Sequence, residues 1–115
     1  MRGNRPSGRN ATGDTQLITI LWRDIPTQVT ARAGRRKVSV QLADRFQIAA
    51  DRAAVVAGKH TTDDYLSEWR RESRPCGEDL DSEAAGAAAA LEATYTRAVL
   101  QRLVESGGMA VEEIP

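Results

Sequence analysis

The residues of this chain best suited to nucleophilic chemistry are its single cysteine, Cys76, and its single histidine, His60. A cysteine attacks as the thiolate, and an adjacent imidazole can remove the thiol proton. A Cys76-dependent enzyme with His60 as the base is therefore one interpretation, and the most remote one. His60 stands in the short connector 58–61, where an exposed turn residue is the usual role.

The same composition argues against a bound metal or cofactor. One histidine and one cysteine supply no pair of ligands at the spacing found in zinc or iron sites. The sequence also lacks the glycine patterns that hold dinucleotides or nucleoside triphosphates. We therefore expect no metal site and no cofactor.

The stretch ILWRDIP ends an apolar run with Trp22, a cation at Arg23 and an anion at Asp24. Neighbouring strand residues point to opposite faces, so Arg23 and Asp24 each need a separate partner or solvent. In the structural interpretation, Asp24 caps the turn that follows it, while Arg23 reaches an acidic helix residue, either Asp51 or Glu68. In the functional interpretation, both side chains lie at the edge of a cleft and present opposite charges to a ligand.

Aromatic residues are scarce, with one Phe, two Trp and two Tyr, so each is expected to dominate the burial around it. Trp22 and Trp69 each close an apolar run, which favours packing in the core or at its rim over stacking on a ligand. Both tryptophans, together with Arg70 beside the second one, stay candidates for contact with a partner.

The chain has no net charge, yet its charges are segregated along the sequence. Residues 1–40 hold eight Lys or Arg against two Asp, whereas residues 76–115 hold eight Asp or Glu against two Arg. Attraction between the two halves of the folded chain is the simpler interpretation, and an anionic partner at the basic end is the other. In the second case, Arg35, Arg36 and Lys37 at a hairpin tip would contact the phosphates of a nucleic acid.

Hydrophobic periodicity predicts a small α+β domain. Apolar residues over 17–22 indicate a buried central strand, and alternation on either side of Gly34 indicates two antiparallel strands joined near residues 33–36. Three helices are expected after the strands: an amphipathic one over 42–58, a short one from residue 61 that carries Trp69 toward the core, and an alanine-rich one over 82–105. A loop is expected over 73–77, because Pro75 disfavours helix before it.

The predicted fold is therefore a three-stranded antiparallel sheet followed by three helices packed on one face. Residues 16–107 form the single domain, between a disordered basic tail over 1–15 and a flexible tail over 108–115. The chain has no apolar run of about 18 residues that could span a bilayer, and no apolar segment follows the basic N-terminus as in a secretory signal. With only one cysteine, these features predict a cytoplasmic protein.

Four segments carry a resemblance to a known family: ITILWRDIPTQV, GRRK, LADRFQIAADRAA and DDYLSEWRRE. Over about residues 16–75 the chain resembles the small domain family called virulence factor, which is also found at the C-terminal end of the larger conserved virulence factor C. The family name describes a phenotype, so the resemblance implies no catalytic residues and no cofactor. Stand-alone members tend to be encoded beside corrinoid and folate one-carbon methyl-transfer enzymes, which implies an accessory role.

We therefore expect a non-catalytic accessory or interaction module that binds a larger protein. The alternatives are a nucleic-acid-binding regulatory protein that uses the basic hairpin, and the Cys76-dependent enzyme. The charge segregation and an alanine-rich helix face able to pack against another protein favour the first of these. The residues proposed for partner or ligand contact are Trp22, Arg23, Asp24, Arg35, Arg36, Lys37, Trp69, Arg70 and Cys76.

Overall fold

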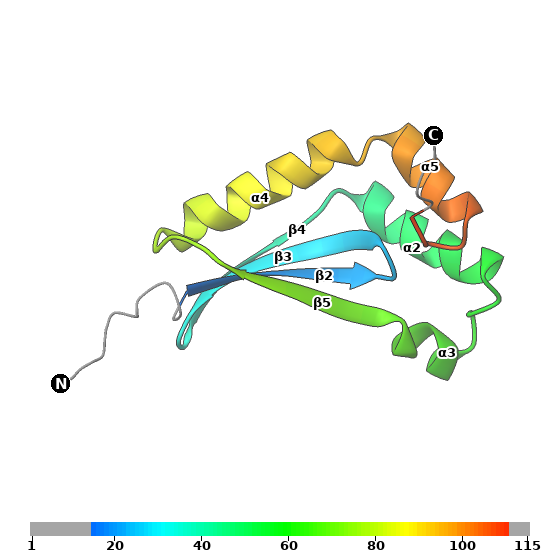
Figure 1. Ribbon diagram of the computed structural model, residues 1–115, viewed down its shortest axis with the longest axis horizontal. Helices are drawn as coiled ribbons and strands as arrows, with labels where there is room; N and C mark the ends of the chain where they lie inside the picture. Colours follow the sequence, from blue (N-terminus) through cyan, green and yellow to red (C-terminus); the bar gives the residue numbers. More distant parts are fainter. Residues whose placement is uncertain (1–14, 111–115) are drawn as a thin grey trace.

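The protein folds around a four-stranded antiparallel sheet, as shown by the computed structural model, which describes residues 15–110 (Figure 1). The strands are β2 (Thr15–Trp22), β3 (Ile25–Ala33), β4 (Arg36–Gln41) and β5 (Trp69–Pro75), in the spatial order β4-β3-β2-β5. The α+β class and the antiparallel sheet are confirmed, and β2 begins at Thr15, inside the expected N-terminal tail. The rest of that tail and residues 111–115 lie outside the described residues.

The first three strands are those predicted from the apolar run over residues 17–22 and from the alternating pattern on either side of Gly34. Val29 and Ala31 of β3 are buried, and the alternating residues Val38 and Val40 of β4 pack partly buried beside them. Gly34 has a φ of 61°, a left-handed conformation that glycine adopts without steric cost, so the β3–β4 hairpin closes here as expected.

The fourth strand corrects the prediction of three strands and of a loop at residues 73–77. β5 pairs along its whole length with β2, from Trp22↔Trp69 to Gln16↔Pro75. Every residue of β5 after Trp69 is exposed, so this edge strand has no apolar alternation from which it could be recognised. Its charges and its terminal proline are the features by which edge strands avoid pairing with other chains.

Within residues 15–110, four helices replace the three that were expected. They are α2 (Asp44–Val56), α3 (Thr62–Ser67), α4 (Leu80–Thr94) and α5 (Arg97–Glu105). The long helix predicted over 82–105 breaks at Thr96, whose side chain accepts a hydrogen bond from the Val99 N–H and so caps α5 at its start. The break lets α5 turn away from the line of α4, as Figure 1 shows.

The helices do not all lie on one face of the sheet, which corrects the predicted packing. α4 runs across the face formed by β3 and β4, while α2 and α5 pack on each other beyond the β2–β3 turn (Figure 1). Among the described elements, no helix covers most of the length of the opposite face. None of the helices within residues 15–110 is long and apolar enough to cross a membrane.

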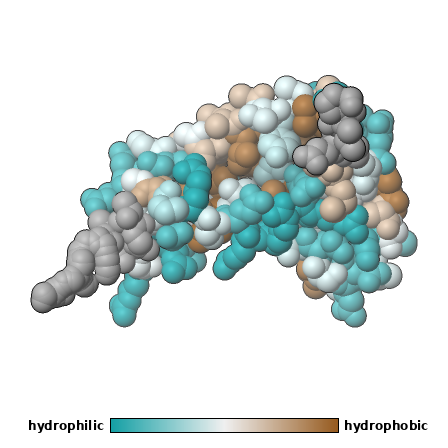
Figure 2. Space-filling view, in the orientation of Figure 1, coloured by the Kyte–Doolittle hydropathy of each residue, from teal (hydrophilic) through white to brown (hydrophobic). Residues whose placement is uncertain are grey.

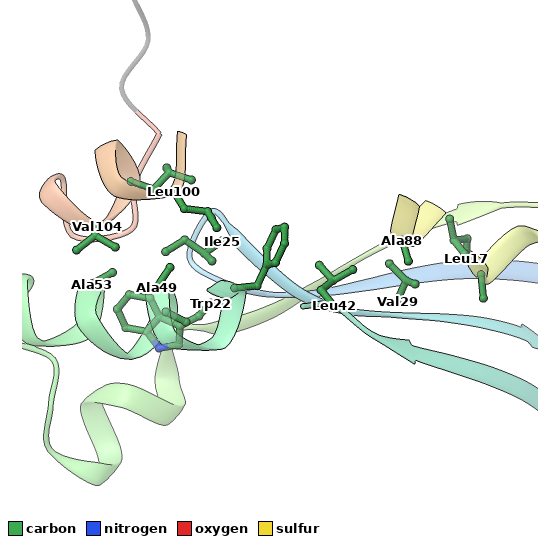
Figure 3. Close-up of a cluster of buried hydrophobic side chains, with 14 of the residues drawn as sticks. Leu17, Trp22, Ile25, Val29, Leu42, Ala49, Ala53, Ala88, Leu100 and Val104 are labelled. Atoms are coloured by element: carbon green, nitrogen blue, oxygen red, sulfur yellow. The ribbon is translucent and has the colours of Figure 1, made fainter. Parts of the chain in front are cut away.

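The core is built from a few large side chains and many alanines. Trp22, Ile25 and Phe46 are fully buried where the end of the sheet meets α2. Figure 3 shows Ala49 and Ala53 of α2 beside Leu100 and Val104 of α5. Small side chains on α2 let α5 approach closely, so the two helices pack against each other and form the groove described below.

Candidate functional site

The Arg23–Asp24 pair forms the two-residue turn between β2 and β3. Arg23 has a φ of 53°, which costs a non-glycine residue about 1 kcal/mol. Two long-range backbone bonds stabilise the turn in this conformation: the Arg23 N–H donates to the Glu68 carbonyl at 3.1 Å, and the Asp24 N–H donates to the Gly108 carbonyl at 2.8 Å. The turn therefore connects the end of α3 with the segment that follows α5.

The Arg23 side chain makes the contacts of the structural interpretation. Its Nε donates to Glu68 Oε1 at 3.1 Å, and its Nη1 donates to the Gly107 carbonyl at 3.1 Å. The guanidinium also lies over the Trp22 ring, 5.4 Å from the centroid. Of the two acidic partners expected, Glu68 is confirmed, and Asp51 bonds to the Tyr65 hydroxyl instead.

Asp24 was expected to cap the turn that follows it. Its carboxylate instead joins two other segments. Its Oδ1 accepts a hydrogen bond from Arg70 Nη2 at 2.9 Å, and its Oδ2 accepts one from the backbone N–H of Ala110 at 2.6 Å. Arg70 also donates from Nε to the Arg23 carbonyl at 2.8 Å and from Nη1 to Glu72 at 2.6 Å. The hydrogen bond to Glu72 raises the pKa of Arg70 above its ordinary value. We call Arg23, Asp24, Glu68 and Arg70 the turn network.

The two tryptophans lie beside this network as cross-strand partners, and both contact the Tyr65 ring. Trp22 stacks on Tyr65 with centroids 5.8 Å apart and donates from Nε1 to the Tyr65 carbonyl at 2.9 Å. Trp69 meets the same ring edge-on at 5.8 Å. Trp22 is fully buried and Trp69 partly buried, so both have packing roles within the described residues.

Cys76 lies at the far end of β5 from the turn network. Its N–H donates to the Thr15 carbonyl, and its carbonyl accepts a hydrogen bond from the Thr15 hydroxyl. Burial and then the Glu83 charge raise the pKa of the Cys76 thiol, which lowers its thiolate fraction at neutral pH. The length of β5, about 20 Å for seven residues, separates Cys76 from the helix that follows His60. The structure thus does not bring these two residues together as a nucleophile and its base.

The basic hairpin residues are exposed, but their arrangement differs from the expected loop. Only Arg35 lies in the turn, since Arg36 and Lys37 begin β4 and point to opposite faces. Arg36 pairs in register with Ala33, and Lys37 pairs with Arg32. None of these cations forms an ion pair with another described residue.

The ion pairs show whether the basic and acidic ends of the sequence contact each other directly. Within residues 15–110 they join Arg23, Lys59 or Arg70 to Asp24, Glu68 or Glu72. None of them links the basic segment before residue 40 to the acidic segment after residue 76. Direct pairing of the two halves is therefore not how the described residues are held together.

The sheet face opposite α4 carries cations and no carboxylate at its described strand positions. The register places one row of side chains across all four strands, with Thr30 and Ser39 hydrogen-bonded at 2.7 Å in its middle. The residues on this uncovered face are Gln16, Ile18, Ile20, Gln28, Thr30, Arg32, Lys37, Ser39, Gln41, Arg71 and Ser73. The sequence alone does not predict this surface, because β5 has no apolar pattern that would mark it as a strand.

A second cationic feature, also absent from the sequence-based predictions, is a groove between α2 and α5. It has a volume of about 160 Å³ and three arginines in its lining. The lining residues are Arg45, Ile48, Ala49, Arg52, Arg97, Leu100, Gln101 and Val104. The helical spacing of Arg45 and Arg52 places them on one side of α2, but nothing in the sequence shows that Arg97 of another helix joins them.

A wider depression of about 910 Å³ lies where α4 meets α5, next to the turn network. Its lining includes Asp24, Tyr95, Val99, Arg102 and Ala110. Burial, followed by the charges of Asp24 and Glu72, raises the pKa of Tyr95. Within residues 15–110, no group of three or more His, Cys, Asp or Glu side chains is arranged to hold a metal ion.

The proposed contact residues thus fall into three places. Trp22, Arg23, Asp24, Trp69 and Arg70 converge around the β2–β3 turn. Arg35, Arg36 and Lys37 lie at the β3–β4 hairpin, and Cys76 lies alone at the other end of β5.

Comparison with known proteins agrees with the resemblance seen in the sequence. The sequence model of the virulence factor family matches residues 20–104, which extends the similarity beyond β5 and through most of α5. No curated protein and no solved structure matches the chain. Since the match covers well over half of its length, the chain belongs to the virulence factor family.

Proposed function

We propose that the protein is a non-catalytic accessory module that binds a larger protein through the outer surface of α2 and α3. The observation that carries the proposal is where the exposed apolar side chains lie. Ile48, Val55 and Val56 of α2 are 53%, 65% and 54% exposed, and Leu66 of α3 is 58% exposed. Among the described large apolar residues, only Met109 is exposed elsewhere.

The two helices present these residues as one surface. The Tyr65 hydroxyl of α3 donates to Asp51 of α2 at 2.9 Å and accepts from Gln47 at 3.1 Å, so α3 is held along α2. Ile48 and Val55 are two turns apart on α2 and therefore lie on the same outward side. Single exposed apolar residues need no explanation, but their concentration on neighbouring helices is typical of an interaction site.

The turn network supports the non-catalytic part of the proposal. Arg23, Asp24 and Arg70 each bond to groups within the domain, so the charged residues with the closest spacing already have structural partners. The arginine with the largest number of bonds, Arg70, joins β5 to the turn rather than facing a cavity.

The partner class follows from the family resemblance described above. We take a corrinoid or folate one-carbon methyl-transfer enzyme in the cytoplasm as the first partner to test. Figure 2 shows a pale to brown surface along α4, where its exposed alanines lie, and a hydrophilic surface over β5. The sequence favoured this alanine-rich face of α4 for partner binding, so a substitution on α4 distinguishes it from the surface of α2 and α3.

The test is a binding titration with purified proteins. The full chain would be titrated into a corrinoid or folate methyl-transfer enzyme of the same organism. The affinity would be measured by calorimetry for the native protein, Val55→Asp, Leu66→Asp and the control Ala90→Asp on α4. Burying a large apolar side chain contributes about 1.5–3 kcal/mol, so we expect each of the first two variants to weaken binding at least tenfold. The Ala90→Asp variant should bind as the native chain does.

Equal affinity of all three variants would remove α2 and α3 as the docking surface. The proposal is wrong if two results are found together: the native chain does not bind the enzyme, and every protein that it captures is also captured by the Val55→Asp variant. Circular dichroism of each variant verifies folding, since all three substitutions lie at exposed positions.

The uncovered face of the sheet favours nucleic-acid binding as a second candidate function. Arg32, Lys37 and Arg71 lie on this face without a carboxylate at the described positions around them, and Arg35 lies beyond its end. Removing one cation that neutralises a phosphate lowers the slope of affinity against salt concentration by about one unit. Anisotropy titrations with single-stranded and duplex oligonucleotides should therefore show a steep salt slope that falls in Lys37→Gln and Arg71→Gln. Absence of binding at low salt would exclude this function.

A further inference from the structure

We propose that the groove between α2 and α5 is a binding site for a phosphate group, held by Arg45, Arg52 and Arg97. This site borders the apolar surface of α2 and α3, since Ile48 belongs to both, but it does not depend on the identity of a protein partner. The inference begins from the three guanidinium groups that line a groove of about 160 Å³ with no carboxylate in its lining.

The path of the chain explains how the three arginines meet. At one end of the helices, Arg45 of α2 donates from Nη2 to the Tyr95 carbonyl, just before α5 begins. At the other end, Ala57 lies next to Gly107, where a Cβ on the glycine would come within 3.1 Å of the Ala57 Cβ. α2 and α5 therefore run in the same direction, and Arg45 and Arg97 lie at the same end of the groove.

Arg45 is positioned before any ligand arrives. Its Nη2 donates to the carbonyls of Glu92 and Tyr95, and its guanidinium carbon lies 4.9 Å from the centroid of the Phe46 ring. Its Nε is buried and has no hydrogen-bond partner among the described residues. A guanidinium that is already oriented, with donor groups still unused, loses little side-chain entropy when it binds an anion.

Arg52 and Arg97 supply the other two positive charges of the groove. Both are exposed, and neither forms a hydrogen bond or ion pair with another described residue. The carboxylate of the neighbouring Glu92 accepts a hydrogen bond from the Ala43 N–H at 3.0 Å. Three like charges around one groove repel one another, and an anion between them turns that repulsion into attraction.

The charge and size of the groove select the ligand class. A phosphate monoester carries close to two negative charges at neutral pH, so it balances three guanidinium groups better than a single carboxylate does. Guanidinium forks bind phosphate oxygens in pairs, which a lysine cannot do. At about 30 Å³ for each water, the volume corresponds to roughly five waters, which is room for a phosphate group. Ala49, Leu100 and Val104 form an apolar floor beneath the three guanidinium groups, which lowers the local dielectric on that side and strengthens their attraction for an anion.

The phosphate group has two sources, a free small molecule or a phosphorylated side chain of a protein. The test therefore begins with inorganic phosphate, titrated into the full chain at constant ionic strength with chloride making up the balance. Chemical-shift changes of backbone amides in α2 and α5 should saturate. A second titration with glycerol phosphate and a third with a phosphoserine peptide distinguish the sources, since the natural one should bind more tightly than inorganic phosphate.

Variants then assign the site. A charge-assisted hydrogen bond contributes enough that Arg52→Gln and Arg97→Gln should each weaken phosphate binding about tenfold or more. Arg102→Gln is the matched control, because Arg102 is exposed on α5 but does not line the groove. Binding should also strengthen from about pH 5 to pH 8 as phosphate takes its second negative charge.

Three outcomes would overturn the proposal. They are linear shift changes that never saturate, equal weakening by Arg102→Gln and Arg97→Gln, and binding of succinate as tight as that of phosphate. Loss of partner binding in Val55→Asp with phosphate binding intact would show that the two surfaces act independently.

Discussion

Asp24 accepts a hydrogen bond from the backbone N–H of Ala110, across 86 positions of sequence, at 2.6 Å. The same carboxylate bonds to Arg70 through its other oxygen. One side chain in a two-residue turn therefore joins the edge strand β5 to the segment that follows α5.

Removing the Asp24 charge tests this connection. Asp24→Asn keeps the shape but weakens the bonds to Arg70 and Ala110, both made by the carboxylate. We expect the free energy of unfolding to fall by about 1–2 kcal/mol, measured by urea denaturation. Glu72→Gln is the control, because the Arg70–Glu72 pair is more exposed and such pairs contribute little. If both substitutions have the same small effect, the carboxylate does not stabilise the turn.

Arg23 offers a test of structure against function. Arg23→Ala removes the bonds to Glu68 and Gly107 while the left-handed φ of the turn remains, so it should destabilise the domain by about 2 kcal/mol. Arg23→Lys keeps the charge but not the fork, and should fall between the native chain and Arg23→Ala. A double-mutant cycle with Glu68→Gln measures the coupling. A stable Arg23→Ala protein that no longer binds its partner would instead give Arg23 a direct role in binding.

The glycines after α5 should not tolerate a side chain. Gly108 has a φ of 91°, and a Cβ there would lie 2.9 Å from Cζ3 of the fully buried Trp22. We expect Gly108→Ala to destabilise the domain by about 3 kcal/mol or more through strain and overpacking. Gly34→Ala isolates the conformational part, because Gly34 also has a positive φ but has open space around it, and should cost only about 1 kcal/mol. Thermal denaturation of the two variants would show the difference, and equal losses would contradict the contact with Trp22.

Both tyrosines of the chain should titrate above their ordinary range in the folded protein. Burial, followed by a hydrogen bond to Asp51, raises the pKa of Tyr65 above 10.0, and burial also raises the pKa of Tyr95. The unfolded chain then loses these protons first as the pH rises, so the free energy of unfolding should fall above about pH 10. Ultraviolet absorbance follows the ionisation directly. A folded protein whose two tyrosines titrate together at the value of the urea-unfolded chain would contradict both shifts.

Cys76 should react slowly with thiol reagents at neutral pH. Burial and the Glu83 charge raise its pKa, so the labelling rate should be lower than in the unfolded chain and should increase at alkaline pH. Glu83→Gln removes one cause of the shift and should speed labelling at a given pH. Rapid labelling of the native chain at pH 7 would revive the Cys76-dependent interpretation.

The sequence predicts those elements whose burial follows a simple period. β2 follows from its continuous apolar run, and β3 and β4 follow from the alternation of Val29 and Val40 with polar residues. α2 follows from the helical spacing from Phe46 to Ala53. β5 escapes prediction because its residues are exposed on both faces, so it carries no period of its own. The break at Thr96 escapes prediction because the apolar stripe continues through it, and only the capping hydroxyl marks the new start.

The candidate site divides in the same way. The contact of Arg23 with Glu68 could be predicted because a partly buried cation at a strand end needs an acidic partner nearby. The groove with Arg45, Arg52 and Arg97 could not be predicted, because it requires α5 to pack alongside α2. That packing follows from the alanines on α2 and the break before α5. Neither feature indicates in the sequence which two helices pack together.

The bond between Asp24 and Ala110 also has a consequence for synthesis of the chain. The β2–β3 hairpin is complete when Ala33 has been added, but the partners of its turn at Gly108 and Ala110 are added only after α5. In a nascent chain that stops at the end of α5, the Asp24 carboxylate lacks its bond to Ala110 and the strained turn lacks its bond to Gly108. We therefore expect the domain to reach its final stability only after the segment beyond the family match at residue 104 has emerged from the ribosome.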